Sequence, residues 1–80
     1  KPDIIIVDPP RAGMHPDMAH YLPKLKAKKI IYVSCNPTTQ ARDAKILCEK
    51  GYELKKSVMV DMFPHTPHIE NIVLFSKKGL

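Results

Sequence analysis

The chain has 80 residues, of which 44% are hydrophobic and 26% charged, a composition typical of one small globular domain. A chain of this length buries only just enough apolar surface for a stable fold. No stretch approaches the roughly 18 apolar residues that a membrane-spanning helix needs, and we expect neither a signal peptide nor a membrane partner. The two cysteines, Cys35 and Cys48, do not make a disulfide framework, so we expect a reducing, cytoplasmic environment.

The formal net charge is +5, and the lysines gather in three segments of the chain. These are Lys24, Lys26, Lys28 and Lys29, then Lys55 and Lys56, then Lys77 and Lys78. A basic balance fits a polyanionic partner such as RNA. Small domains also carry this much lysine as a solvated surface, so charge alone leaves both interpretations open.

The chain opens with an apolar run at residues 4–8, which predicts a first strand. Continuous runs of this kind are typical of strands buried on both faces of a parallel sheet. A central strand at the start of a domain leaves its neighbours unexplained, so we expect the chain to be the carboxy-terminal part of a longer protein. Without those neighbours the strand Ile4–Val7 would be an exposed apolar edge, through which we expect the isolated chain to self-associate.

Prolines mark the next segment. Pro9 and Pro10 predict a loop over residues 9–13, because proline disfavours helix and removes ladder donors. Pro16 fits the first turn of a helix, and Pro23 should break or kink it. Apolar residues recur at helical spacing across this stretch, at Met14, Met18, Leu22 and Leu25.

A second strand is expected at residues 29–34, followed by a helix. Asn36 is the expected N-cap of that helix, Pro37 its first residue, and Gly51 its C-cap. The expected buried stripe consists of Ala41, Ala44, Leu47 and Cys48.

Two further strands are expected at about residues 53–61 and at residues 69–77. The segment between them, 62–68, is too short for a crossover helix, which predicts an antiparallel pair. The expected fold is α/β with the plan β-α-β-α-β-β.

Cys35 stands at the carboxyl end of the second strand and at the start of the following helix. Ligands of open α/β sheets bind at the carboxyl ends of strands, and a helix amino terminus favours thiolate over thiol. The position therefore suits a nucleophile. The alternative is an inert buried cysteine, which is what we expect of Cys48 on the apolar helix face.

Two other strand ends carry candidate groups. Asp8 could accept hydrogen bonds from a ligand and Arg11 could bind a phosphate, although Asp-Pro pairs also simply initiate turns. Glu70 lies among apolar residues, where a carboxylate is expensive to bury. A carboxylate kept at such a position suggests a function, and a general base is the candidate. His65 and His68 have a spacing that invites a zinc site, but Thr66-Pro67 prevents a helical pair and no second ligand pair is evident, so we expect no metal.

Taken together, these residues resemble the RNA uracil-5-methyltransferases. The resemblance runs from Asp8 to Glu70 and rests on three motifs: Asp8-Pro9-Pro10-Arg11-x-Gly13, Ile30-Ile31-Tyr32-x-Ser34-Cys35-Asn36-Pro37-x-Thr39, and Asp61-x-Phe63-Pro64-His65-Thr66-x-His68-Ile69-Glu70. It implies an S-adenosylmethionine-dependent enzyme that makes 5-methyluridine in RNA. The fold implied is the carboxy-terminal half of a Rossmann-like methyltransferase sheet. The glycine-rich cofactor loop and any RNA-binding domain or iron–sulfur cysteines would then lie upstream.

The resemblance also implies roles for individual residues. Cys35 would attack carbon 6 of uracil, Glu70 would remove the proton from carbon 5, and Asp8 would lie at the S-adenosylmethionine site. Arg11 and Asn36 would contact the substrate. The Phe63-Pro64-His65-Thr66 segment favours ribosomal RNA, specifically 23S, over transfer RNA as the substrate.

Two other classes of function stay open. Methyltransferases that act on exocyclic amines also place an acidic or amide residue before Pro-Pro, but an aromatic residue typically follows where Arg11 stands here, and they need no thiol. A non-catalytic RNA-binding module could retain the motifs as a scaffold.

Overall fold

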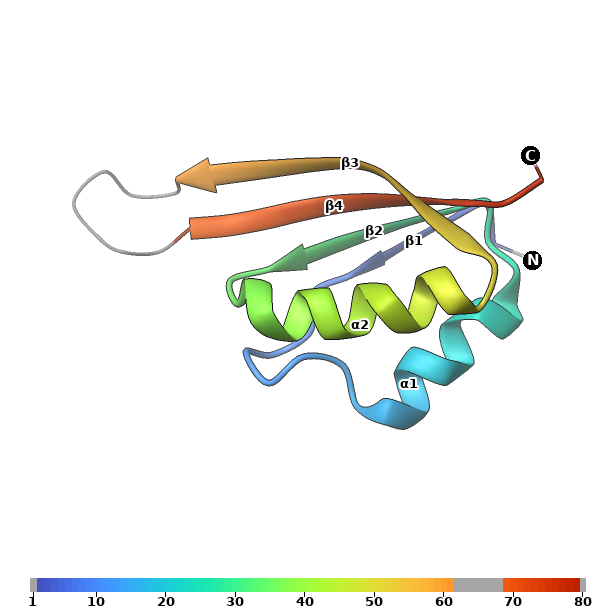
Figure 1. Ribbon diagram of the computed structural model, residues 1–80, viewed down its shortest axis with the longest axis horizontal. Helices are drawn as coiled ribbons and strands as arrows, with labels where there is room; N and C mark the ends of the chain where they lie inside the picture. The colour runs from blue at the N-terminus through green and yellow to red at the C-terminus, as the bar shows by residue number, and fades with distance from the viewer. Residues whose placement is uncertain (1, 62–68, 80) are drawn as a thin grey trace.

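The computed structural model describes residues 2–61 and 69–79 of the chain. Figure 1 shows the elements in chain order: β1 (Ile4–Val7), α1 (Pro16–Tyr21), the 3-10 helix η1 (Leu22–Leu25), β2 (Lys29–Ser34), α2 (Pro37–Glu49), β3 (Tyr52–Asp61) and β4 (Ile69–Lys77). The predicted order β-α-β-α-β-β and the mixed α/β class are confirmed. Strand bounds differ from the prediction by one residue at two places, since β1 ends at Val7 and β3 begins at Tyr52.

The four strands form one sheet in the order β1-β2-β4-β3. β1 and β2 are parallel, whereas β4 runs antiparallel to both β2 and β3. The predicted antiparallel pairing of the last two strands is therefore confirmed. Residues 62–68, which include His65 and His68, lie outside the described residues.

Both helices lie on the same face of the sheet, and the core fills the space between them and the strands (Figure 1). Side chains from both layers meet there, among them Leu22, Ile30, Tyr32, Leu47, Tyr52 and Phe75. No helix among residues 2–61 and 69–79 is long and apolar enough to cross a membrane.

The opposite face of the sheet has no covering layer among the described residues. Ile4 and Ile6 of β1 are 53% and 69% exposed, so the expected burial of this strand on both faces is wrong for the chain by itself. β1 is an edge strand of the described sheet. Further along this face, Ile31, Val58, Ile72 and Leu74 line a shallow hollow.

The prolines act as their positions predict. α1 begins at Pro16, and the chain tightens into η1 around Pro23 instead of continuing as one regular helix. Leu22 and Met14 are buried and Leu25 packs against the core, but Met18 is exposed and does not join them.

α2 has the predicted ends. The Asn36 side chain caps the helix by accepting a hydrogen bond from the Thr38 amide, and Gly51 follows the last residues with a φ of 104°. The predicted buried stripe is partly wrong. Ala41 is exposed, while the fully buried positions of the helix are Gln40, Asp43 and Leu47.

Asp43 is the charged group at the centre of the packing between the layers. It is 1% exposed, and its Oδ2 accepts hydrogen bonds from the Met14 amide at 2.9 Å and from the Tyr32 hydroxyl at 2.5 Å. Burial and then the Asp43 carboxylate raise the pKa of Tyr32, so this hydroxyl keeps its proton and donates it. Arg42 Nη2 lies 3.3 Å from Asp43 Oδ1 and supplies the opposite charge. The carboxylate thereby joins α2 to β2 and to the chain entering α1.

Replacing Asp43 should therefore be costly. Asp43→Ala would leave the Met14 amide and the Tyr32 hydroxyl buried without an acceptor, which we expect to lower the free energy of unfolding by about 2–4 kcal/mol. The matched control, Asp17→Ala, removes an exposed carboxylate of α1 and should cost less than about 1 kcal/mol. Urea denaturation followed by circular dichroism measures both; equal losses would show that the Asp43 carboxylate does not hold these elements together.

Candidate active site

The carboxyl ends of two strands and the amino end of a third meet at the same edge of the sheet. The parallel register pairs Val7 with Tyr32, so the carboxyl ends of β1 and β2 lie side by side. The antiparallel register pairs Ser34 with Asn71, so the amino end of β4 reaches the same edge. Asp8, Cys35 and Glu70 are the residues next to these ends. The structure therefore brings together the three strand ends that the sequence singled out.

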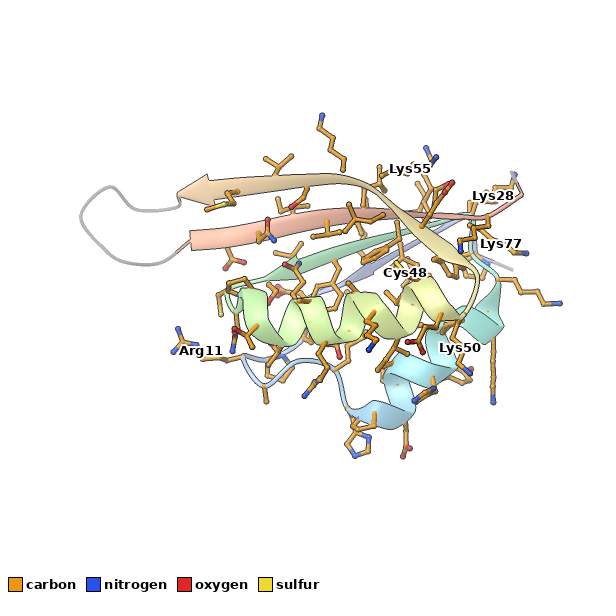
Figure 2. All side chains as sticks on the ribbon, viewed as in Figure 1. Arg11, Lys28, Cys48, Lys50, Lys55 and Lys77 are labelled. Atoms are coloured by element: carbon orange, nitrogen blue, oxygen red, sulfur yellow. The ribbon has the colours of Figure 1, made fainter. Side chains whose placement is uncertain are left out.

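Cys35 lies at a tight bend between β2 and α2. The buried Ser34 hydroxyl accepts a hydrogen bond from the Asn36 amide at 2.9 Å and lies 3.1 Å from the Asn36 carbonyl oxygen, to which it donates. This local closure turns the chain at Cys35 and leaves that residue exposed. Cys48, in contrast, is half-buried on α2 and packs against the core (Figure 2).

The loop after β1 borders an open hollow of about 650 Å³, lined by Val7, Asp8, Pro9, Pro10, Met14 and Arg42 among others. Asp8 is exposed at its rim. The loop turns at Gly13, whose amide donates to the Pro10 carbonyl oxygen at 2.8 Å. Gly13 has a φ of 86°, and a Cβ there would lie 2.6 Å from Arg42 Nη2. Only glycine fits this turn without moving the groups that hold the loop.

The first turns of α2 hold this loop through its main-chain oxygens. Asn36 Nδ2 and Thr39 Oγ1 donate to the Arg11 carbonyl oxygen at 3.0 and 3.1 Å. Arg42 Nη2 donates to the carbonyl oxygens of Ala12 at 3.1 Å and Met14 at 3.3 Å. The loop that carries Asp8 is thus fixed relative to the bend that carries Cys35.

Two of the predicted substrate contacts have different surroundings. Asn36 uses both polar atoms of its side chain within the chain, as the helix cap and as a donor to the loop. This is a structural role, and its contact with substrate stays a prediction. The Arg11 side chain instead extends away from the body of the molecule at this end (Figure 2).

Glu70 is half-buried, and its Oε2 atom is buried without a hydrogen-bond partner among the described residues. A buried carboxylate oxygen with no donor is costly for folding. Such an atom is available to accept a proton or a hydrogen bond from a ligand.

Sequence reasoning assigned no structural role to the polar residues that assemble this edge, namely Thr39, which is part of the second motif, Gln40 and Asp43. Gln40, Asp43 and Leu47 follow the i, i+3, i+7 spacing of one helix face, which could have placed two polar residues in the core.

Three lysines from different segments of the chain lie far from the candidate site. Lys28, Lys50 and Lys77 lie at the end of the molecule opposite Arg11 (Figure 2). There the Lys77 amide donates to the Lys28 carbonyl oxygen, because β2 begins where β4 ends.

Comparison with known proteins identifies the family. The model of the tRNA (uracil-5-)-methyltransferase family matches residues 1–78. A 23S rRNA (uracil(1939)-C(5))-methyltransferase, RlmD, of Acinetobacter baumannii strain AB0057 is 53% identical over 75 residues, which are 94% of this chain and 16% of that protein. An uncharacterized RNA methyltransferase of Bacteroides thetaiotaomicron is 57% identical over 74 residues, 92% of this chain and 16% of that protein.

A solved structure has the same fold over the same region. The crystal structure of Pyrococcus abyssi tRNA (uracil-54, C5)-methyltransferase in complex with S-adenosyl-L-homocysteine superposes with a TM-score of 0.79 and 51% sequence identity. The alignment covers 91% of this chain and 18% of that one. The chain thus spans less than a fifth of the length of these relatives. It belongs to the tRNA (uracil-5-)-methyltransferase family.

Proposed function

We propose that this chain is part of an enzyme that transfers a methyl group from S-adenosylmethionine to carbon 5 of a uridine in RNA. The observation that carries the proposal is the β2–β4 register. In it the exposed Cys35 and the Glu70 oxygen, which has no partner among residues 2–61 and 69–79, lie next to the last paired residues, Ser34 and Asn71. A nucleophile and a base at neighbouring strand ends suit a reaction that needs both.

Carbon 5 of uracil is a weak nucleophile, and Cys35 would make it a stronger one. Its thiolate adds to carbon 6, forming a carbon–sulfur bond and moving the electron pair of the double bond into an enolate. Carbon 5 then takes the methyl group that the sulfonium of S-adenosylmethionine supplies. The base must leave its stack to reach Cys35, as in other enzymes that modify bases.

Glu70 would complete the reaction. Its carboxylate takes the proton from carbon 5, the double bond between carbons 5 and 6 forms again, and the carbon–sulfur bond breaks to release the Cys35 thiolate. The unpaired Oε2 atom supports this role, because no described donor competes for it.

Asp8 fits the cofactor as a hydrogen-bond acceptor. It is exposed at the end of β1 and lines the hollow of about 650 Å³, where a carboxylate could hold an amino or hydroxyl group. We propose that the chain is the carboxy-terminal half of a Rossmann-like methyltransferase sheet, with the glycine-rich cofactor loop elsewhere in the protein.

The proposed substrate is ribosomal RNA. The 23S rRNA enzymes among the relatives support this, although the related solved structure is of a transfer RNA enzyme. We propose that the protein acts in the cytoplasm.

Cys35 should be the residue that binds RNA covalently. In the full-length protein, RNA with 5-fluorouridine at the target should trap a covalent complex, because fluorine cannot leave as a proton does. Cys35→Ala should abolish the trapped complex, and Cys48→Ala, the matched control, should retain it. Denaturing gel electrophoresis with labelled RNA reads the result; a trapped complex in Cys35→Ala would refute the assignment.

Glu70 should act after methyl transfer. Glu70→Gln removes the base but leaves the thiolate and the methyl donor, so covalent protein–RNA adducts should accumulate with unmodified RNA. The adduct should carry a labelled methyl group. If the variant released methylated RNA at the normal rate, another group would be the base.

The isolated chain should self-associate through β1 or the apolar face beside it. Ile4 and Ile6 are exposed on an unpaired edge, and a two-fold dimer would cover them. The affinity of the isolated chain for S-adenosylmethionine should be weak, since Asp8 alone cannot replace a complete cofactor site. Sedimentation with Ile6→Lys as the control variant, together with a cofactor titration, tests this. A wild-type monomer at tens of micromolar, or tight cofactor binding, would contradict it.

A further inference from the structure

Two side-chain amides connect the helix layer to the strand that carries Glu70. Gln40 Nε2 of α2 donates to the main-chain oxygen of Asn71 on β4 at 2.9 Å, and Asn71 Nδ2 donates back to Gln40 Oε1 at 2.6 Å. Gln40 Nε2 also donates to the Tyr32 carbonyl oxygen of β2 at 3.2 Å. One side chain therefore joins α2, β2 and β4 directly beside the candidate site.

Gln40 is an unusual residue for its position. It is 2% exposed on the face of α2 that packs on the sheet, where an apolar side chain of similar size would need no partner. A buried amide must find hydrogen bonds, and its net contribution to stability is small once they are made. The Gln40–Asn71 pair accordingly fixes the position of β4 relative to α2 more than it adds to the free energy of unfolding.

The arrangement that it fixes is the start of β4. Asn71 is the residue of β4 that pairs with the last residue of β2, Ser34, and Glu70 is the next residue outward. Asn71 Oδ1 also accepts from Ser57 Oγ of β3 at 3.1 Å. Because side chains alternate along a strand, fixing Asn71 on the helix side sets the direction of Glu70 on the other side.

We infer that Gln40, through its amide pair with Asn71, is a positioning residue that sets the Glu70 carboxylate relative to Cys35 for removal of the carbon 5 proton. The inference rests on the proposed role of Glu70 as the base. A small displacement of the Glu70 carboxylate would still allow thiolate attack and methyl transfer, because both steps precede removal of the carbon 5 proton.

The test uses the full-length protein and follows individual steps. Gln40→Leu should lower kcat by about 10- to 100-fold, because small displacements of a reacting group are costly. The KM for RNA should change by less than about threefold, and methylated covalent adducts should accumulate as they do in Glu70→Gln.

A double variant separates positioning from stability. Gln40→Leu with Asn71→Leu removes both amides together, so neither amide is left buried without the other. The urea unfolding midpoint should therefore rise above that of Gln40→Leu alone, although the Tyr32 and Asn71 carbonyl oxygens still lack the Gln40 donor. The kcat of the double variant should stay low. Recovery of normal kcat in this double variant would overturn the inference, because the pair would then serve only the packing.

Tyr52→Phe is the matched control for loss of a buried hydrogen bond. The Tyr52 hydroxyl donates to the Ala27 carbonyl oxygen at 2.5 Å, at the end of the molecule away from Cys35, so this variant should keep kcat and accumulate no covalent adduct. Failure of the proposed function would be seen separately, as covalent trapping by Cys35→Ala. If Cys35→Ala and Glu70→Gln behave as expected while Gln40→Leu releases RNA at the normal rate, the positioning role alone is wrong.

Discussion

The reversed direction of β4 is the constraint on which the candidate site depends. In a wholly parallel sheet only carboxyl ends of strands meet at the ligand edge, and a residue at the start of a strand lies at the opposite edge. Because β4 runs antiparallel to β2, Glu70 at its amino end comes to the end of β2 that precedes Cys35. β4 also runs antiparallel to β3, its neighbour both in the sheet and in the chain. A thiol and a carboxylate that are 35 positions apart in sequence thus share one edge.

Helix α2 has polar side chains at buried positions where apolar ones would pack, and these side chains connect the strands and loop of the candidate site. Asp43 and Gln40 occupy the buried face of α2, and each needs several partners to offset the cost of burial. Asp43 finds them in Tyr32 and the chain before α1, whereas Gln40 finds them in β2 and β4. The two residues therefore attach different parts of the site to one rigid element. A purely apolar helix face would offer these parts no directional hydrogen bonds.

Local signals in the sequence were sufficient for most of the fold. Strand β2 and strand β4 have the predicted bounds, because their apolar runs end at strong turn residues, and Asn36-Pro37 marks the start of α2. The prediction failed where partners that are distant in sequence decide which side chains are buried. Ala41 is exposed because Gln40 and Asp43 take the buried positions, and their partners belong to other elements. The meeting of Cys35 and Glu70 likewise depends on strand order, which no local pattern encodes.

The open face of the sheet links stability to the site. By the alternation of side chains along β4, Glu70 shares a face with Ile72 and Leu74, and these two line the shallow apolar hollow on the uncovered side. Ile4 and Ile6 of β1 are exposed at the edge of the same sheet. An element that buries this apolar surface must also pass close to Glu70 and to the strand end beside Cys35. For the reaction proposed above, covering the sheet would also shield Cys35 and Glu70 from water, so the hydrophobic gain from burial and the exclusion of water from the proposed base would be linked.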